Sequence, residues 1–193
     1  MHDPVDEQAL IQRAIDDPDA FQELYTRYVR RVYSYVASRI GHRQDAEDVV
    51  SEVFLRVIKN LDQLRQRQQT SFAAWLFVIA RHAIADHYRK NGHSEEYISL
   101  DVAELCAPAE KQPDHLLSHN EESAYLYSLI LTLPERKREI ITLRFYGGLR
   151  NQEIAKVLGI GEKTVSAYLS RAVNDLQEKC HAAQSARGQI RDE

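Results

Sequence analysis

NQEIAKVLGIGEKTVSAYLS, residues 151–170, predicts two short helices joined by a tight turn. Ala155 is small enough to let the second helix approach the first. Gly159 stands where the chain must turn with a positive φ, a conformation that costs little only for glycine. The apolar residues of the small shared core are Ile154, Val157, Leu158, Ile160, Val165 and Leu169. This spacing is typical of a helix-turn-helix, which places its second helix in the major groove of DNA.

The outer face of the second helix carries the side chains that would meet base edges and phosphates. These residues are Lys163, Thr164, Ser166, Ala167, Tyr168, Ser170 and Arg171. The plainer alternative is an amphipathic helical hairpin with no role on DNA. The agreement between the turn position and the packing positions favours the DNA-binding interpretation.

Composition places the chain in the all-α class. Its 193 residues are 44% apolar, and its apolar residues recur at spacings of three and four almost throughout. No apolar run reaches the length of a membrane span, and the N-terminus is acidic where a signal peptide would be basic. Cys106 and Cys180 fit neither a disulfide framework nor a CxxC metal site. We therefore expect a cytoplasmic protein that does not insert into membranes.

The formal net charge of −4 hides a segregation of charge along the chain. Residues 27–43 contain five Arg and no acid, and residues 134–179 contain nine Lys or Arg against six Asp or Glu, a net of +3. The connecting segment, residues 91–123, is strongly acidic. Because phosphate neutralisation supplies most non-specific affinity, such weakly basic blocks predict weak unaided binding to DNA. A partner that holds the protein on DNA is therefore expected.

The helical patterns predict two small domains and a flexible connector. The first domain, residues 5–91, should contain four helices: one over residues 5–16, a second capped by Asp19 and ended by Gly41, a third over 45–61, and a fourth over 72–90 capped by Ser71. A polar loop, residues 62–71, precedes the fourth helix. Residues 92–120 predict an acidic linker, residues 121–180 a second domain with Pro134 in the first turn of a helix, and residues 181–193 a frayed tail.

The third predicted helix carries an acidic ridge. Asp45, Asp48 and Glu52 fall at i, i+3 and i+7, opposite a predicted buried stripe. The stripe consists of Ala46, Val49, Val50, Val53, Val57 and Ile58. Such a ridge is usually a solvated face, and a surface that docks on another protein is the alternative interpretation.

The fourth predicted helix mixes aromatic and basic residues. The aromatic residues are Phe72, Trp75, Phe77 and Tyr88, and the basic ones are Arg81, His82, His87, Arg89 and Lys90. This mixture suits single-stranded DNA, whose unstacked bases lie on rings while cations follow the phosphates. The alternative is that Phe72, Trp75 and Ile79 simply belong to the core.

Three segments together carry a family resemblance: DAEDVVSEVFLRVI, FAAWLFVIARHAIADHYRK and LPERKREIITLRFYGGLRNQEIAKVLGIGEKTVSAYLSRA. Over about residues 9–180 the chain resembles the extracytoplasmic-function class of bacterial RNA polymerase sigma factors. The resemblance implies a sigma domain 2 at 5–91 and a sigma domain 4 at 121–180. It also implies that the third helix grips a coiled coil on the largest polymerase subunit. The residues implied in that contact are Asp45, Asp48, Glu52, Phe54 and Arg56.

The same resemblance implies two contacts with promoter DNA. The helix-turn-helix would read the −35 element as duplex, and the fourth helix with its preceding loop would melt and read the −10 element as a single strand. The residues implied at −10 are Arg65, Arg67, Arg81, His82, Arg89 and Lys90. The resemblance further implies that the second domain contacts the polymerase flap and that the linker passes through basic channels of polymerase. It also implies an anti-sigma factor as a partner. The chain departs from the family pattern at His82, where Asn is common, and at Ser166 and Tyr168, where basic residues are common.

Two other classes of protein are possible from the sequence. A stand-alone helix-turn-helix regulator would bind an operator as a dimer, but the N-terminal block lacks the α/β alternation of a receiver domain. An enzyme would need a site. His115 and His119 lie at i, i+4, yet no ligand set at metal-binding spacing accompanies them, and no HExxH or phosphate loop occurs. We therefore expect no catalytic residue, no metal and no cofactor.

Overall fold

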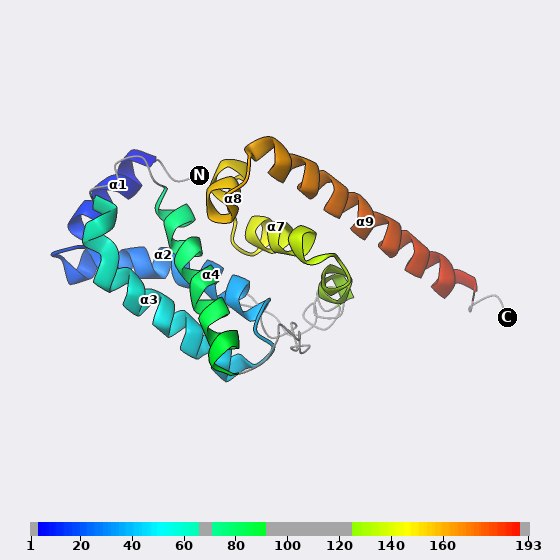
Figure 1. The fold of residues 1–193 in the computed structure, drawn as a ribbon, viewed down its shortest axis with the longest axis horizontal. Helices are drawn as coiled ribbons and strands as arrows, with labels where there is room; N and C mark the ends of the chain where they lie inside the picture. The colour runs from blue at the N-terminus through cyan, green and yellow to red at the C-terminus, as the bar shows by residue number, and fades with distance from the viewer. Residues whose placement is uncertain (1–3, 66–70, 92–124, 190–193) are drawn as a thin grey trace, which may run out of the picture. The chain divides into compact units, whose positions relative to one another are not determined.

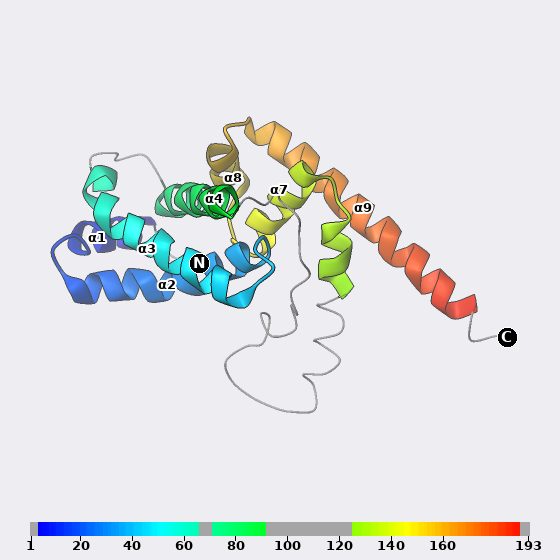
Figure 2. The same ribbon diagram turned by 60° about the horizontal axis from the view of Figure 1, so that its bottom comes forward.

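A computed structural model describes residues 4–65, 71–91 and 125–189, and these contain helices and turns but no strand. The chain divides into two compact units, Met1–Ile98 and Ser99–Glu193 (Figures 1 and 2). The first contains α1 (Pro4–Arg13), α2 (Pro18–Ala37), α3 (Arg43–Arg65) and α4 (Phe72–Lys90). The second contains a helical segment at 125–131, then α7 (Glu135–Phe145), α8 (Asn151–Leu158) and α9 (Glu162–Gln189). The all-α prediction is confirmed.

In the first unit, α3 packs against both α2 and α4, and α1 packs on α2. Aromatic rings fill the space between α2 and α4. Tyr28 meets Phe72 edge-on with ring centroids 5.0 Å apart, and Tyr35 meets Phe77 in the same way at 5.3 Å. Edge-to-face pairs of this kind stabilise a fold beyond the area that they bury. These ring pairs fix how α2 and α4 lie against each other.

Several helix boundaries differ from the sequence prediction. Asp17, and not Asp19, caps α2, because its carboxylate accepts the backbone N–H of Asp19 at 3.0 Å and Pro18 occupies the first helical position. α2 ends at Ala37, before Gly41. α3 runs to Arg65, into the predicted loop, because Leu61 and Leu64 continue its buried stripe. The predicted cap of α4 is confirmed, since the Ser71 hydroxyl accepts the N–H of Ala74 at 3.4 Å.

The second unit contains the helix-turn-helix that the sequence predicts. Gly159 ends α8 with φ of 64°, in the left-handed region. Ile154 of α8 and Val165 of α9 are fully buried where the two helices meet, whereas Ile160 and Leu169 keep partial exposure. A second apolar cluster joins α9 to α7 and to the segment before it. Its buried members are Ile130, Leu133, Ile141 and Ala172, with Leu169, Val173 and Leu176 packed against them.

Some predicted features lie at or beyond the edges of what the structure describes. α9 continues to Gln189, past the position near 181 where the loss of an apolar stripe predicted fraying. Residues with good helix propensity, among them two adjacent alanines at 182–183, favour continuation of the helix. The predicted linker, with Cys106, His115 and His119, lies outside the described residues, as does Arg67. Within the described helices, none combines the length and apolar character that crossing a membrane requires.

Candidate nucleic-acid and protein interfaces

The N-terminal part of α9 presents one face to solvent and buries the other. Val165 is fully buried against α8, and the residues predicted to meet DNA surround it. The exposed ones are Lys163, Thr164, Ser166, Ala167, Ser170 and Arg171, and Tyr168 is half-buried. The helix therefore offers a polar surface of the kind that a recognition helix inserts into a groove.

Asn151, which sequence reasoning missed, contacts this surface. It lies at the start of α8, and its side-chain amide nitrogen donates to the Ser166 hydroxyl at 3.0 Å. The other amide atom, Oδ1, is buried without a hydrogen-bond partner. A hydroxyl group can both accept and donate, so Ser166 keeps the capacity for a further hydrogen bond. The contact links the start of α8 to the outer face of α9.

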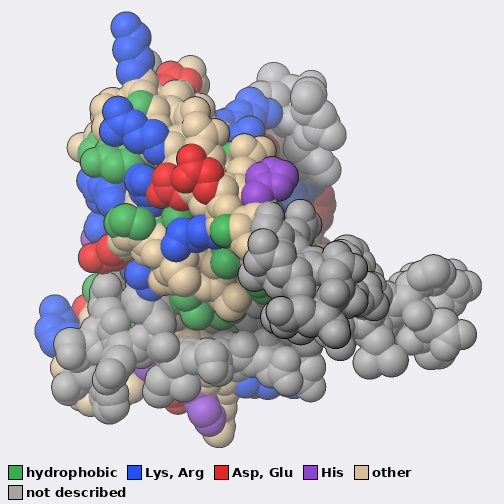
Figure 3. Space-filling model, turned by 90° about the vertical axis from the view of Figure 1, so that its right-hand side faces the viewer, with side chains coloured by type: hydrophobic (Ala, Val, Ile, Leu, Met, Phe, Trp, Pro, Cys, Tyr) green, Lys and Arg blue, Asp and Glu red, His purple; other side chains and the backbone are tan. Residues whose placement is uncertain are grey.

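Charge on the surface is mixed. On the face drawn in Figure 3, Asp and Glu side chains lie among those of Lys and Arg. Arg144 and Arg150 add exposed cations to the second unit, and the Arg144 guanidinium is fixed by donating to the Leu149 carbonyl at 2.9 Å. This distribution agrees with the weak net positive charge of the segment and with modest unaided affinity for DNA.

The acidic ridge of α3 lies at the surface, with Asp48 and Glu52 exposed and Asp45 partly covered. Two apolar side chains lie beside the ridge: Leu55 is 51% exposed and Ile58 is 55% exposed. The assignment of Ile58 to the buried stripe was wrong, because residue 58 follows Leu55 by three positions and shares its outward face. Acidic and apolar side chains therefore form a mixed outer surface on α3.

Two residues predicted to contact a partner are turned inward. Phe54 is only 5% exposed and packs edge-on against Tyr25 of α2, with ring centroids 4.6 Å apart. The Phe54 ring therefore helps to hold α3 against α2. Arg56 is half-buried, and its guanidinium contacts Glu52 on α3 itself and Asp86 on α4. The contact of these two residues with polymerase stays a prediction.

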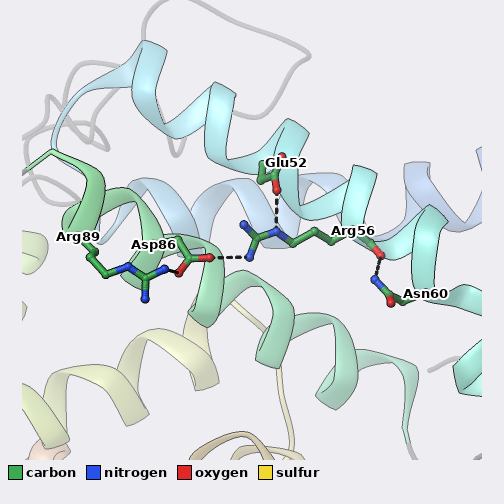
Figure 4. A network of polar contacts seen from close by, with 5 residues as sticks. All are labelled: Glu52, Arg56, Asn60, Asp86 and Arg89. Atoms are coloured by element: carbon green, nitrogen blue, oxygen red, sulfur yellow. Dashed lines mark hydrogen bonds and ion pairs between the residues drawn. The ribbon is translucent and has the colours of Figure 1, made fainter.

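A polar network joins α3 to α4 (Figure 4). Arg56 Nε donates to Glu52 Oε1 at 2.7 Å, and Arg56 Nη1 donates to Asp86 Oδ2 at 2.9 Å. The second oxygen of Asp86 accepts from Arg89 Nη2 at 2.7 Å, and the Asn60 amide donates to the Arg56 carbonyl at 2.7 Å. Hydrogen bonding from Arg56 lowers the pKa of Glu52 and that of Asp86 below their ordinary values, so both remain ionised at neutral pH.

The basic residues of α4 differ in how far they are free to meet a ligand. His82, Arg89 and Lys90 are exposed, and Arg81 is partly covered. His87 is directed to α3, with its Nε2 3.9 Å from Asp45 Oδ2, and the Tyr88 hydroxyl donates to the Arg39 carbonyl. Phe72 belongs to the core as the alternative held, whereas Trp75 and Ile79 are half-buried. The backbone at Arg65 is helical, and its side chain lies outside the described part.

Within the described ranges, no group of three or more His, Cys, Asp or Glu residues is placed to hold a metal ion. The arrangement defines a two-unit helical protein with an exposed recognition helix in one unit. The other unit carries a mixed acidic and apolar helix face.

Comparison with known proteins identifies the class. Residues 24–94 match the family model of Sigma-70 region 2, and residues 123–176 match that of Sigma-70 region 4. The ECF RNA polymerase sigma-E factor of Escherichia coli is 30% identical over 187 residues, covering 93% of this chain and 96% of that protein. The chain belongs to the extracytoplasmic-function (ECF) class of RNA polymerase sigma factors.

Other relatives agree. The ECF sigma factor BldN of Streptomyces coelicolor is 34% identical over 171 residues, covering 86% of this chain; the match spans 63% of BldN. Two solved structures share the fold. CnrH, in complex with the cytosolic domain of CnrY, has a TM-score of 0.67 at 24% identity, with 91% of this chain and 97% of that chain covered. RpoE of Bartonella quintana, in complex with the anti-sigma factor NepR, has a TM-score of 0.62 at 22% identity, with 82% and 94% covered.

Proposed function

We propose that this chain binds core RNA polymerase and directs transcription initiation at specific promoters. Residues 5–91 act as sigma domain 2 and residues 121–180 as sigma domain 4, with residues 92–120 connecting them. The observation that carries the proposal is the exposed, polar N-terminal face of α9, set by Val165 against α8, in a chain whose other unit matches Sigma-70 region 2. The role is non-catalytic, since polymerase performs the chemistry, and it places the protein in the cytoplasm.

At the −35 element, α9 enters the major groove of duplex DNA. Lys163, Thr164 and Arg171 hold phosphates or bases, and Ser166 and Tyr168 tune the sequence that is read. The Ser166 hydroxyl, which Asn151 contacts, donates to an acceptor on the base edge, which N7 and O6 of guanine, N7 of adenine and O4 of thymine provide. We therefore expect a −35 preference that differs from that of relatives with basic residues at these positions.

At the −10 element, the C-terminal half of α4 binds the separated strand. Arg81, His82, Arg89 and Lys90 supply the polar and charged contacts, together with Arg65 and Arg67 from the preceding segment. The exposed positions of His82, Arg89 and Lys90 support this role. His82 stands where Asn is common in the family, so we expect it to change which base of the −10 element is bound.

The docking surface for polymerase is the outer face of α3. Asp48 and Glu52 provide charge, Leu55 and Ile58 provide apolar area, and Asp45 lies at the edge of the same ridge. Apolar side chains at the centre with charges around them are typical of protein interfaces. The partner is the coiled coil of the largest subunit, and sigma domain 4 would meet the polymerase flap. An anti-sigma factor that covers these surfaces is proposed as well, on the precedent of the B. quintana complex.

Run-off transcription with purified core polymerase on genomic fragments tests the proposal. The expected result is specific transcripts that appear only when the chain is added to the core enzyme. Leu55→Glu should lose this activity, and Leu126→Glu, the same change at an exposed leucine that no proposed contact uses, is the matched control. If no initiation rises above that of core alone, the sigma function is wrong, and dimeric operator binding becomes the function to test.

A further inference from the structure

Asp86 is an acidic residue in the middle of the basic end of α4. Arg89 follows it by three positions and Lys90 by four, so all three share one side of the helix. Its Oδ1 is bound by Arg89 at 2.7 Å, although the Arg89 side chain is 79% exposed. A carboxylate at this place would compete with a DNA phosphate for Arg89 and would repel the phosphate itself.

Arg56 neutralises that carboxylate from the neighbouring helix. Its Nη1 lies 2.9 Å from Asp86 Oδ2, and the two side chains are only 27% and 26% exposed. Glu52 holds Nε of the same guanidinium at 2.7 Å, which fixes the direction in which Arg56 reaches across (Figure 4). Because the Arg56–Asp86 ion pair is partly shielded from water, dissolved salt screens it only weakly. The contact of Arg89 with Asp86 lies at the open edge of the network.

We propose that Arg56 is a positioning residue for strand binding: it occupies Asp86 so that Arg89 can leave for a phosphate of the −10 strand. Arg56 thus serves DNA binding from α3 without itself touching DNA. This inference rests on the proposed −10 role of α4. It differs from a purely structural role, in which the Arg56–Asp86 pair would matter as a tether between two helices.

Variants of Arg56 and Arg89, the two residues that bind the Asp86 carboxylate, separate these roles. The chain is first assembled with core polymerase. The affinity of this holoenzyme is then measured for a fluorescent single-stranded oligonucleotide. The oligonucleotide carries the −10 segment of a promoter found by run-off transcription. Arg56→Gln should weaken binding about as much as Arg89→Gln, roughly fivefold at 0.1 M salt for one lost phosphate contact. The slope of log affinity against log salt should fall by about 0.7. The double variant Arg56→Gln with Arg89→Gln should be no weaker than Arg89→Gln alone.

Removal of the carboxylate is the decisive arm. Asp86→Asn abolishes the ion pair but also the competition for Arg89, so the proposal expects affinity and salt slope at or above those of the unsubstituted chain. The same change should restore Arg56→Gln. Circular dichroism melting and holoenzyme assembly are measured in parallel, so that loss of fold is seen separately.

The outcomes are distinguishable. If Asp86→Asn weakens strand binding, or fails to restore Arg56→Gln in a folded holoenzyme, the pair is a tether and the inference is overturned. Both results leave the sigma function intact as long as the unsubstituted holoenzyme initiates specifically. Absence of specific initiation by the unsubstituted holoenzyme instead removes the proposed function, and this inference with it.

Discussion

The turn at Gly159 should be the most position-sensitive point of the helix-turn-helix. Its φ of 64° lies in the left-handed region, where a residue with a Cβ costs about 1–2 kcal/mol. A Cβ at this position would meet no heavy atom within 4 Å, so the cost is one of backbone conformation and not of collision. Gly159→Ser should therefore lower the free energy of unfolding of the second unit by about 1–2 kcal/mol. For a unit of this size that corresponds to roughly 5–15 °C in melting temperature.

Gly161→Ser provides a matched control, since it makes the same change two residues along the chain. Its Cβ would lie in ordinary contact, 3.7 Å from the Thr164 hydroxyl, and the Gly161 carbonyl already accepts the N–H of Val165 at the start of α9. Serine is a favoured residue at such a helix start, so the change should be neutral or slightly stabilising.

The single tryptophan makes the assay specific for each unit. Trp75 lies in the first unit, so its fluorescence reports unfolding there, whereas circular dichroism reports both units. Gly159→Ser should shift the circular dichroism transition and leave the fluorescence transition in place. Equal losses from the two serine substitutions, or a loss at Gly159 below a few tenths of a kcal/mol, would refute the reasoning that a positive φ fixes this turn.

Three further predictions concern the surfaces. Leu55→Glu should reduce affinity for core polymerase at least tenfold in a direct binding assay with unchanged melting temperature, because it places a charge in an apolar contact. Asn151→Ala should alter base preference at −35 in the same positions as Ser166→Ala, measured by systematic promoter substitution; changes at unrelated positions would exclude a role of Asn151 that acts through Ser166. The pKa of Asp86 is lowered from its ordinary 3.8, so its pairing contributes stability above that pH and loses it as pH falls through the lower, folded-state value. Arg56→Gln should flatten this acid dependence in pH-dependent unfolding, and an unchanged acid profile would contradict it.

Local rules account for what the sequence could predict. The Gly159 turn, the buried Val165 and the Ser71 cap each follow from interactions within a few residues, and the structure places all three as expected. At the N-terminus of α2 the sequence prediction took Asp19 as the cap, although Asp17 directly precedes a proline. The proline preference for the first helical position decides in favour of Asp17.

The differences arise where a neighbouring helix decides. Phe54 and Leu55 are adjacent and both apolar, and only the presence of Tyr25 on α2 determines that the ring turns inward. Ile58 lies at the edge of the helical stripe, where the period alone does not separate buried from exposed. The Arg56–Asp86 contact joins residues 30 apart in sequence, beyond the reach of any local pattern.

The candidate site follows the same division. Exposure on the outer face of α9 could be predicted from helix geometry, because Val165 fixes which face is inward. The contact between Asn151 and Ser166 could not, since it depends on how closely the start of α8 approaches α9. A signal was nevertheless present: a polar residue at a helix start facing a small hydroxyl on the next helix is a candidate pair once the turn between the helices is known.

The central claim is that two helical units, each containing a basic block, read a promoter together, and only on polymerase. One footprinting experiment tests it most directly: the chain alone and the chain with core polymerase, on the same promoter, with thymine reactivity recorded at −10. The account predicts no protection by the chain alone, and protection at −35 with reactive thymines at −10 for the holoenzyme. Protection of a site by the chain alone, or a holoenzyme that protects −35 without opening −10, would contradict it.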